Sequence, residues 1–236
     1  MSTWREDLRA LKQELPFKES SLFLLVGFLL ILQHYFARYT VLARLLKSYV
    51  EPAELEMWAS LSWCGLIIVL YALIPSLWIK WVYRERLRDY GWSMRGLGKH
   101  WKPYVLFFLL MLGPLLFAAT TPAFKNTYPF FDYVKTSWTL FALWQAAYAL
   151  QFVAVEFFFR GFITFGLYPR FGSFAFFISM IPYAMIHFPK PLGESLGAMI
   201  AGLVLGYLAY KNKSIWGGAI LHWLIAFSMD LGALVL

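Results

Sequence analysis

Four ionisable residues interrupt the most apolar half of the chain. Glu156 and Arg160 lie four residues apart in 155-VEFFFRG-161, and two histidines follow as His187 and His222. A charged side chain in hydrocarbon costs at least about 2.5–3.5 kcal/mol, so these residues need a function or strong partners there. A carboxylate and two imidazoles on neighbouring hydrophobic segments can activate water. The pattern therefore predicts one shared polar site inside a helix bundle.

Each of these residues also has a structural interpretation. Glu156 and Arg160 face the same way on a helix, with the glutamate first, which is the favourable order for an ion pair. The pair can simply join helices, or it can hold Glu156 ionised and oriented as a general base. A lone histidine on an apolar segment is more often a satisfied core residue. The functional interpretation of His187 and His222 therefore depends on their occurring together with Glu156.

Three further polar residues are predicted to be structural. Asp230 follows His222 by eight residues and can hold a partner helix. Glu194 begins a helix, where an acidic side chain interacts favourably with the helix dipole. His34 lies in the first apolar segment, far from the other histidines in sequence.

The composition is that of a membrane protein. Hydrophobic residues make up 61% of the chain and charged residues 14%, whereas soluble domains average about 25% charged residues. The chain is long enough for about seven apolar spans, with six to eight as the range, in an all-α polytopic transmembrane helix bundle. The net charge of +8 is assigned to basic loops at a membrane surface rather than to nucleic-acid binding. The predicted spans are 21–41, 57–80, 103–121, 137–167, 172–189, 193–210 and 214–235.

These spans predict three regions: a cytoplasmic tail (1–20), N-terminal transmembrane helices (21–121) and catalytic core helices (137–235). We interpret the fourth span as one long tilted helix that Pro169 stops, because proline interrupts helical hydrogen bonding. A break at Gly161 is the alternative. With the N-terminus in the cytoplasm, 15 of the 21 lysines and arginines fall on the cytoplasmic side. The positive-inside rule then predicts a cytoplasmic N-terminus.

The order and spacing of the motifs resemble the CPBP family of CAAX prenyl proteases and bacteriocin-processing enzymes, also called the ABI family. Members are polytopic intramembrane proteases with a Glu-Glu-x-x-x-Arg motif, then Phe-x-x-x-His, then a late histidine often followed four residues on by Asn. The resemblance covers about residues 139–232. The segments that show it are 155-VEFFFRGF-162, 183-YAMIHFPKP-191, the glycine-rich 197-GAMIAGLVLGYLAYKNKSIWGG-218 and His222.

Three positions depart from the family pattern. Val155 stands where the family has the first glutamate, to which the water-activating role is usually assigned. Tyr183 replaces the phenylalanine before the histidine, and Ala226 replaces the asparagine, so an oxyanion-stabilising amide is missing.

The resemblance implies an intramembrane endopeptidase that acts on a membrane-associated protein or peptide. Glu156 with His187 would activate water, His222 would bind the water or stabilise the oxyanion, and Arg160 would orient Glu156. The set leaves both a glutamate-dependent mechanism and a zinc site open, since one Glu and two His can ligate zinc with an open position.

Two other functions remain open from the sequence. A catalytically weakened member could serve as a membrane scaffold or in bacteriocin immunity, and the loss of the first glutamate favours this. A proton-coupled transporter would use buried Glu and His as a relay, yet the sequence shows no inverted repeat with broken helices. Residues that converge on one point would favour hydrolysis, whereas residues strung along a pore would favour transport. The short, compact chain suggests a bacterial protein of the plasma membrane.

Overall fold

The computed structural model describes residue 4 and residues 14–94, 100–125, 127–129, 135 and 137–235. Most of the predicted N-terminal tail, residues 1–3 and 5–13, lies outside the described residues. The described part is helical and contains no strand. Its elements are α2 (Phe17–Phe36), α3 (Tyr39–Leu46), α4 (Leu55–Ile68), η1 (Val69–Leu73), α5 (Ile74–Trp78), η2 (Ile79–Tyr83), η3 (Leu87–Tyr90), α6 (Lys102–Ala119), α7 (Pro122–Lys125), α8 (Trp138–Glu156), η5 (Phe157–Phe165), α9 (Gly166–Phe171), α10 (Phe174–Met185), α11 (Leu192–Asn212) and α12 (Trp216–Val235).

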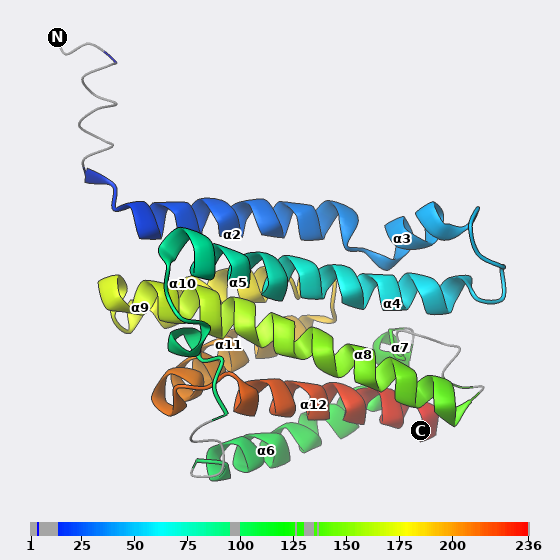
Figure 1. Cartoon of the computed structure of the whole chain (residues 1–236). Coiled ribbons are helices and arrows are strands. Elements are labelled where there is room, and N and C mark those ends of the chain that lie inside the picture. Colours follow the sequence, from blue (N-terminus) through cyan, green and yellow to red (C-terminus); the bar gives the residue numbers. More distant parts are fainter. Residues whose placement is uncertain are drawn as a thin grey trace.

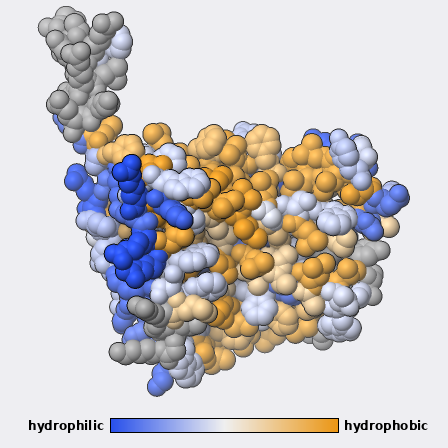
Figure 2. All heavy atoms as spheres, viewed as in Figure 1, coloured by the Kyte–Doolittle hydropathy of each residue, from blue (hydrophilic) through white to orange (hydrophobic). Residues whose placement is uncertain are grey.

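The predicted polytopic bundle is confirmed. Within the described residues, six helices are long and apolar enough to cross a membrane, and the shorter apolar helix Phe174–Met185 lies at the position of the fifth predicted span. The helices run side by side (Figure 1). Figure 2 shows apolar side chains over the middle of the bundle and hydrophilic ones gathered at the end where α2 begins. This distribution suits a bilayer, which takes up the apolar band and leaves the polar end in water.

The helix formed by α8, η5 and α9 lies at the centre of the bundle. In its most apolar window 89% of the residues are buried, compared with 11 to 33% in the other five spans. It runs unbroken from Trp138 to Phe171, as predicted, and Gly161 does not break it. Pro169 does not stop it either, contrary to our prediction. Pro169 lies inside the last turn, and the chain turns instead at Gly172, whose φ of 54° and ψ of −137° suit glycine.

A π-helical stretch, η5, begins directly after Glu156 and carries Arg160. Wider turns of this kind often occur at functional sites. The carbonyl of Phe159 accepts hydrogen bonds from Thr164 Oγ1 at 2.8 Å and from Ser179 Oγ of α10 at 2.6 Å. These side chains satisfy a backbone group inside the apolar bundle and fix η5 to α10.

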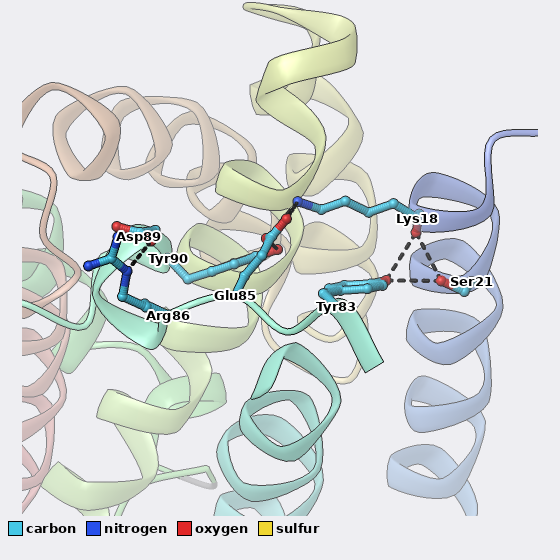
Figure 3. Close-up of polar contacts among 7 residues, drawn as sticks. All are labelled: Lys18, Ser21, Tyr83, Glu85, Arg86, Asp89 and Tyr90. Atoms are coloured by element: carbon cyan, nitrogen blue, oxygen red, sulfur yellow. Dashed lines mark hydrogen bonds and ion pairs between the residues drawn. The ribbon is translucent and has the colours of Figure 1, made fainter. Parts of the chain in front are cut away.

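The loop after η2 packs beneath the central helix and ties it to other spans. The carbonyl of Gly91 accepts a hydrogen bond from the backbone N–H of Ile215, just before α12, at 3.0 Å. A Cβ at Gly161 would lie 2.7 Å from the carbonyl oxygen of Tyr90, so the close approach requires glycine. Lys18 of α2 donates to Glu85 in this loop at 2.7 Å, and Glu85 also accepts a hydrogen bond from Tyr90. Figure 3 shows Lys18 extending across to Glu85.

The membrane orientation can be tested with cysteines, because the chain has a single buried cysteine, Cys64. In a Cys64→Ser background, we expect Glu51→Cys to react with a membrane-impermeant maleimide on intact cells. Arg86→Cys should react only after permeabilisation, because the excess of basic residues predicts that its loop lies in the cytoplasm. The reverse labelling pattern would show that the N-terminus lies outside.

Candidate active site

Glu156 and Arg160 form a fully buried ion pair, as their spacing predicts. Arg160 Nε lies 3.2 Å from Glu156 Oε2, and their side chains are 1% and 0% exposed. The guanidinium also lies over the ring of Tyr183, with 4.0 Å between its carbon and the ring centroid, and its Nη2 donates to the carbonyl of Ala201 at 3.5 Å. The cation–π contact compensates part of the lost hydration of the guanidinium. Arg160 thereby joins the central helix to α10 and α11.

His222 meets the other oxygen of Glu156. Its Nδ1 lies 3.1 Å from Glu156 Oε1. Since a carboxylate only accepts hydrogen bonds, this contact places a proton on Nδ1 and leaves Nε2 for a second partner. The ring packs against Phe152 with a centroid distance of 4.2 Å. Residues 66 positions apart in the chain are therefore brought into one hydrogen-bonded pair.

His187 lies in the turn between α10 and α11, and its carbonyl accepts a hydrogen bond from Ser195 Oγ at 2.7 Å. Its Nδ1 lies 2.8 Å from the carbonyl oxygen of Tyr183. A carbonyl only accepts, so Nδ1 carries the proton and Nε2 keeps a lone pair. The ring of Tyr183 stands between the histidines, 4.7 Å from the ring of His187 and 6.1 Å from that of His222.

Both histidines line one cavity of about 170 Å³. At ~30 Å³ per molecule it has room for several waters. Glu156 and Arg160 lie behind its wall and do not line it. The structure therefore brings Arg160 and His222 into contact with Glu156 and places His187 on the same cavity as His222. The four residues gather at one site. The walls come from α6, α8, α10, α11, α12 and the turn after α10.

A second polar group on this cavity was not predicted from the sequence. Lys190 and Glu194 line it, with Lys190 Nζ 3.7 Å from Glu194 Oε1. The hydroxyl of Tyr128 donates to both carboxylate oxygens of Glu194, at 3.0 and 2.9 Å. The i, i+4 spacing of Lys190 and Glu194 could have indicated their pairing, but no sequence signal connects Tyr128 with them.

Asp230 has the helix-linking position that the sequence suggested. Its Oδ2 accepts hydrogen bonds from Trp144 Nε1 at 2.8 Å and Gln145 Nε2 at 2.7 Å, both on α8. Gln145 Oε1 in turn accepts from Trp223 Nε1 at 3.2 Å. Because Trp223 follows His222, this buried network fixes the rotation of α12 against α8 close to the histidine.

Gly218 is a further residue that the sequence did not single out. A Cβ at this position would lie 2.6 Å from Glu156 Oε2. The glycine lies four residues before His222, one helical turn away, so it clears the space in which the carboxylate meets both partners. A pair of glycines just before a histidine in an apolar helix was the available signal.

The arrangement does not form a metal site of the kind the sequence left open. Among the described residues no group of three or more His, Cys, Asp or Glu could hold a metal ion. In the predicted ligand set, Glu156 Oε1 is bound to His222 and Oε2 faces the guanidinium of Arg160. A guanidinium at that distance repels a cation, so the predicted Glu and His donors do not fit zinc in this arrangement.

The chain resembles one known protein family over part of its length. No curated protein and no solved structure matches the chain. One family model does match, over the segment that contains Glu156, Arg160, His187 and His222. Residues 136–228 match the family described as type II CAAX prenyl endopeptidase Rce1-like, which confirms the resemblance to the CPBP family over this segment of a multi-pass membrane bundle.

Proposed function

We propose that the protein is an intramembrane endopeptidase that hydrolyses a peptide bond of a membrane-associated protein or peptide. The observation that carries the proposal is the contact of buried Glu156 with His222 at the wall of a cavity that His187 also lines. The match of residues 136–228 to the type II CAAX endopeptidase family supports the same reaction class. We further propose a bacterial plasma membrane as the location, with the N-terminus in the cytoplasm.

The two histidines have complementary roles in this proposal. The lone pair on His187 Nε2 accepts a proton from water while the water oxygen bonds to the scissile carbonyl carbon. His222 in its protonated form donates from Nε2 to the resulting oxyanion, and Glu156 balances the charge on the ring. As the C–N bond breaks, the proton held by His187 passes to the leaving amine. Arg160 acts through Glu156, since it fixes the second oxygen of the carboxylate.

The apolar bundle explains how peptide hydrolysis could proceed within a membrane. The cavity is small, and aromatic and aliphatic side chains form most of its walls, including Phe107, Phe152, Leu205 and Leu221. Such walls limit entry of bulk water and strengthen the electrostatic contact between a protonated His222 and an oxyanion. Substrate residues therefore compete with only a few water molecules at the site.

Replacing Glu156 with Gln keeps the shape of the side chain and removes its charge. We expect protein termini present in membranes with the wild-type chain to be missing with Glu156→Gln, because His222 loses its counter-ion. The measurement is a comparison of protein termini in membranes that contain equal amounts of each chain. Glu51→Gln, which changes an exposed glutamate, is the matched control. Identical termini in all three samples would favour the alternative, a weakened family member with a scaffold or immunity role.

Adding one methyl group at Gly218 tests the geometry of the site without changing its charges. We expect Gly218→Ala to push the Glu156 carboxylate away and lower cleavage roughly 10- to 100-fold, since a displacement near 1 Å can cost ~100-fold. Gly65→Ala is the control, because a Cβ at Gly65 meets nothing within 4 Å. Cleavage of the substrate identified by the terminus comparison is the measurement, and equal rates for both variants would contradict the assigned position of Glu156.

The donor arrangement predicts that hydrolysis does not depend on a bound metal. We expect purified protein in detergent to keep its full cleavage rate after treatment with 1,10-phenanthroline or EDTA, because Arg160 occupies the side of Glu156 that a cation would need. A loss of activity that added zinc restores would contradict the proposed mechanism and support a zinc enzyme.

A further inference from the structure

The cavity contains a carboxylate that the mechanism above does not use. Glu194 lines it, whereas Glu156 lies behind its wall. Val155, at the position where the family has its first glutamate, is 6% exposed and belongs to the apolar core. The site therefore has an open carboxylate on α11 in place of one on α8.

Glu194 is held close to His187 by the backbone between them. The N–H of Lys190 donates to the carbonyl of His187 at 2.9 Å, and Ser195 Oγ donates to the same carbonyl at 2.7 Å. Residues 187–195 thus form a compact segment at the edge of the cavity, and this segment carries both a histidine and a carboxylate.

Hydrogen bonds orient the carboxylate of Glu194 from one side, and its other side is open to the cavity. Tyr128 donates to both of its oxygens, and Lys190 Nζ donates to the Tyr128 hydroxyl at 3.0 Å. Burial raises the pKa of Tyr128 well above its usual value, so the hydroxyl keeps the proton that it donates. The side chain of Glu194 remains 26% exposed. An oriented carboxylate with a free face can take a proton from water.

A helix-terminal role explains part of this arrangement but not all of it. An acidic residue in the first turn of α11 suits the helix dipole, and its pairing with Lys190 is a common i, i+4 contact. Neither interaction requires the carboxylate to face a cavity shared with His187 and His222. The position of the residue on that cavity is what points to chemistry.

We propose that Glu194 is the catalytic carboxylate that activates water together with His187, in place of the glutamate missing at Val155. This inference rests on the proposed endopeptidase function and changes its proton acceptor: Glu194 takes the proton of the water in place of His187, and His187 orients the water. His187 Nε2 accepts one hydrogen bond from the water, and Glu194 takes the other proton while the water oxygen bonds to the carbonyl carbon. Glu194 then passes this proton to the leaving nitrogen as the C–N bond breaks. Glu156 acts on the oxyanion side, through His222.

The first arm of the test compares three variants on the substrate found by the terminus comparison. We expect Glu194→Gln to lower kcat about 100-fold or more with KM changed less than threefold, because the carboxylate acts on water rather than on substrate binding. Lys190→Gln breaks the ion pair but keeps the carboxylate, so its kcat should fall less than tenfold. Glu156→Gln provides the reference for a lost active site. Equal protein abundance and thermal midpoints are verified for each variant.

The second arm restores a carboxylate at the family position. By helical spacing Val155 shares a face of α8 with the lining residues Phe152 and Tyr148, although its own side chain does not line the cavity. Val155→Glu combined with Glu194→Gln should have a kcat at least tenfold higher than that of Glu194→Gln alone. Val155→Glu combined with Glu156→Gln should recover none, because that variant lacks the counter-ion of His222 rather than the base.

The first arm decides the proposal by itself if the Val155→Glu chains do not fold. Glu194→Gln with kcat within threefold of wild type, or with a loss no larger than that of Lys190→Gln, would overturn the role of Glu194 and leave the endopeptidase function intact. A wild-type chain that cleaves nothing would overturn the proposed function as well.

Discussion

The burial of one carboxylate constrains the rest of the site. Glu156 is 0% exposed in an apolar bundle, where an unpaired charge would be prohibitively costly. Arg160 provides the counter-charge, His222 provides a hydrogen bond, and Gly218 leaves the space in which both meet the carboxylate. The central position of α8, η5 and α9 follows from this requirement, because only a helix surrounded by others can hide an ion pair from lipid.

The same burial separates two roles, ion pairing and water activation, that the sequence analysis had both assigned to Glu156. A side chain that is enclosed on all sides can orient its neighbours and neutralise their charges, but it cannot bind a water molecule from the cavity. In the proposed mechanism Glu156 therefore acts through His222, which lines the cavity. A group that exchanges protons with water must line the cavity, as His187 and Glu194 do. The role proposed for each side chain therefore depends on whether it lines the cavity or lies behind the residues that do.

The departures from the family pattern take on physical meaning in this setting. Val155 contributes to the apolar core, and Ala226 leaves no amide at the cavity. Lys190 and Glu194, from the segment that follows α10, line the cavity instead, and Tyr128 donates a hydrogen bond to Glu194. Electrostatic stabilisation of a reacting group depends on where donors and acceptors lie, rather than on which helix supplies them.

The sequence by itself determined the helical membrane bundle, because apolar segments of spanning length leave few alternatives. It also determined the Glu156–Arg160 ion pair, since i, i+4 spacing is a local property of a helix. The end of the central helix was placed wrongly at Pro169, because one missing N–H in a final turn costs little where a glycine makes the turn just beyond it. Only the tertiary structure decided that His222 meets Glu156 and that Glu194 faces the cavity. Contacts between residues far apart in sequence depend on the rotation and depth at which helices pack, and hydrophobic patterns leave these undetermined.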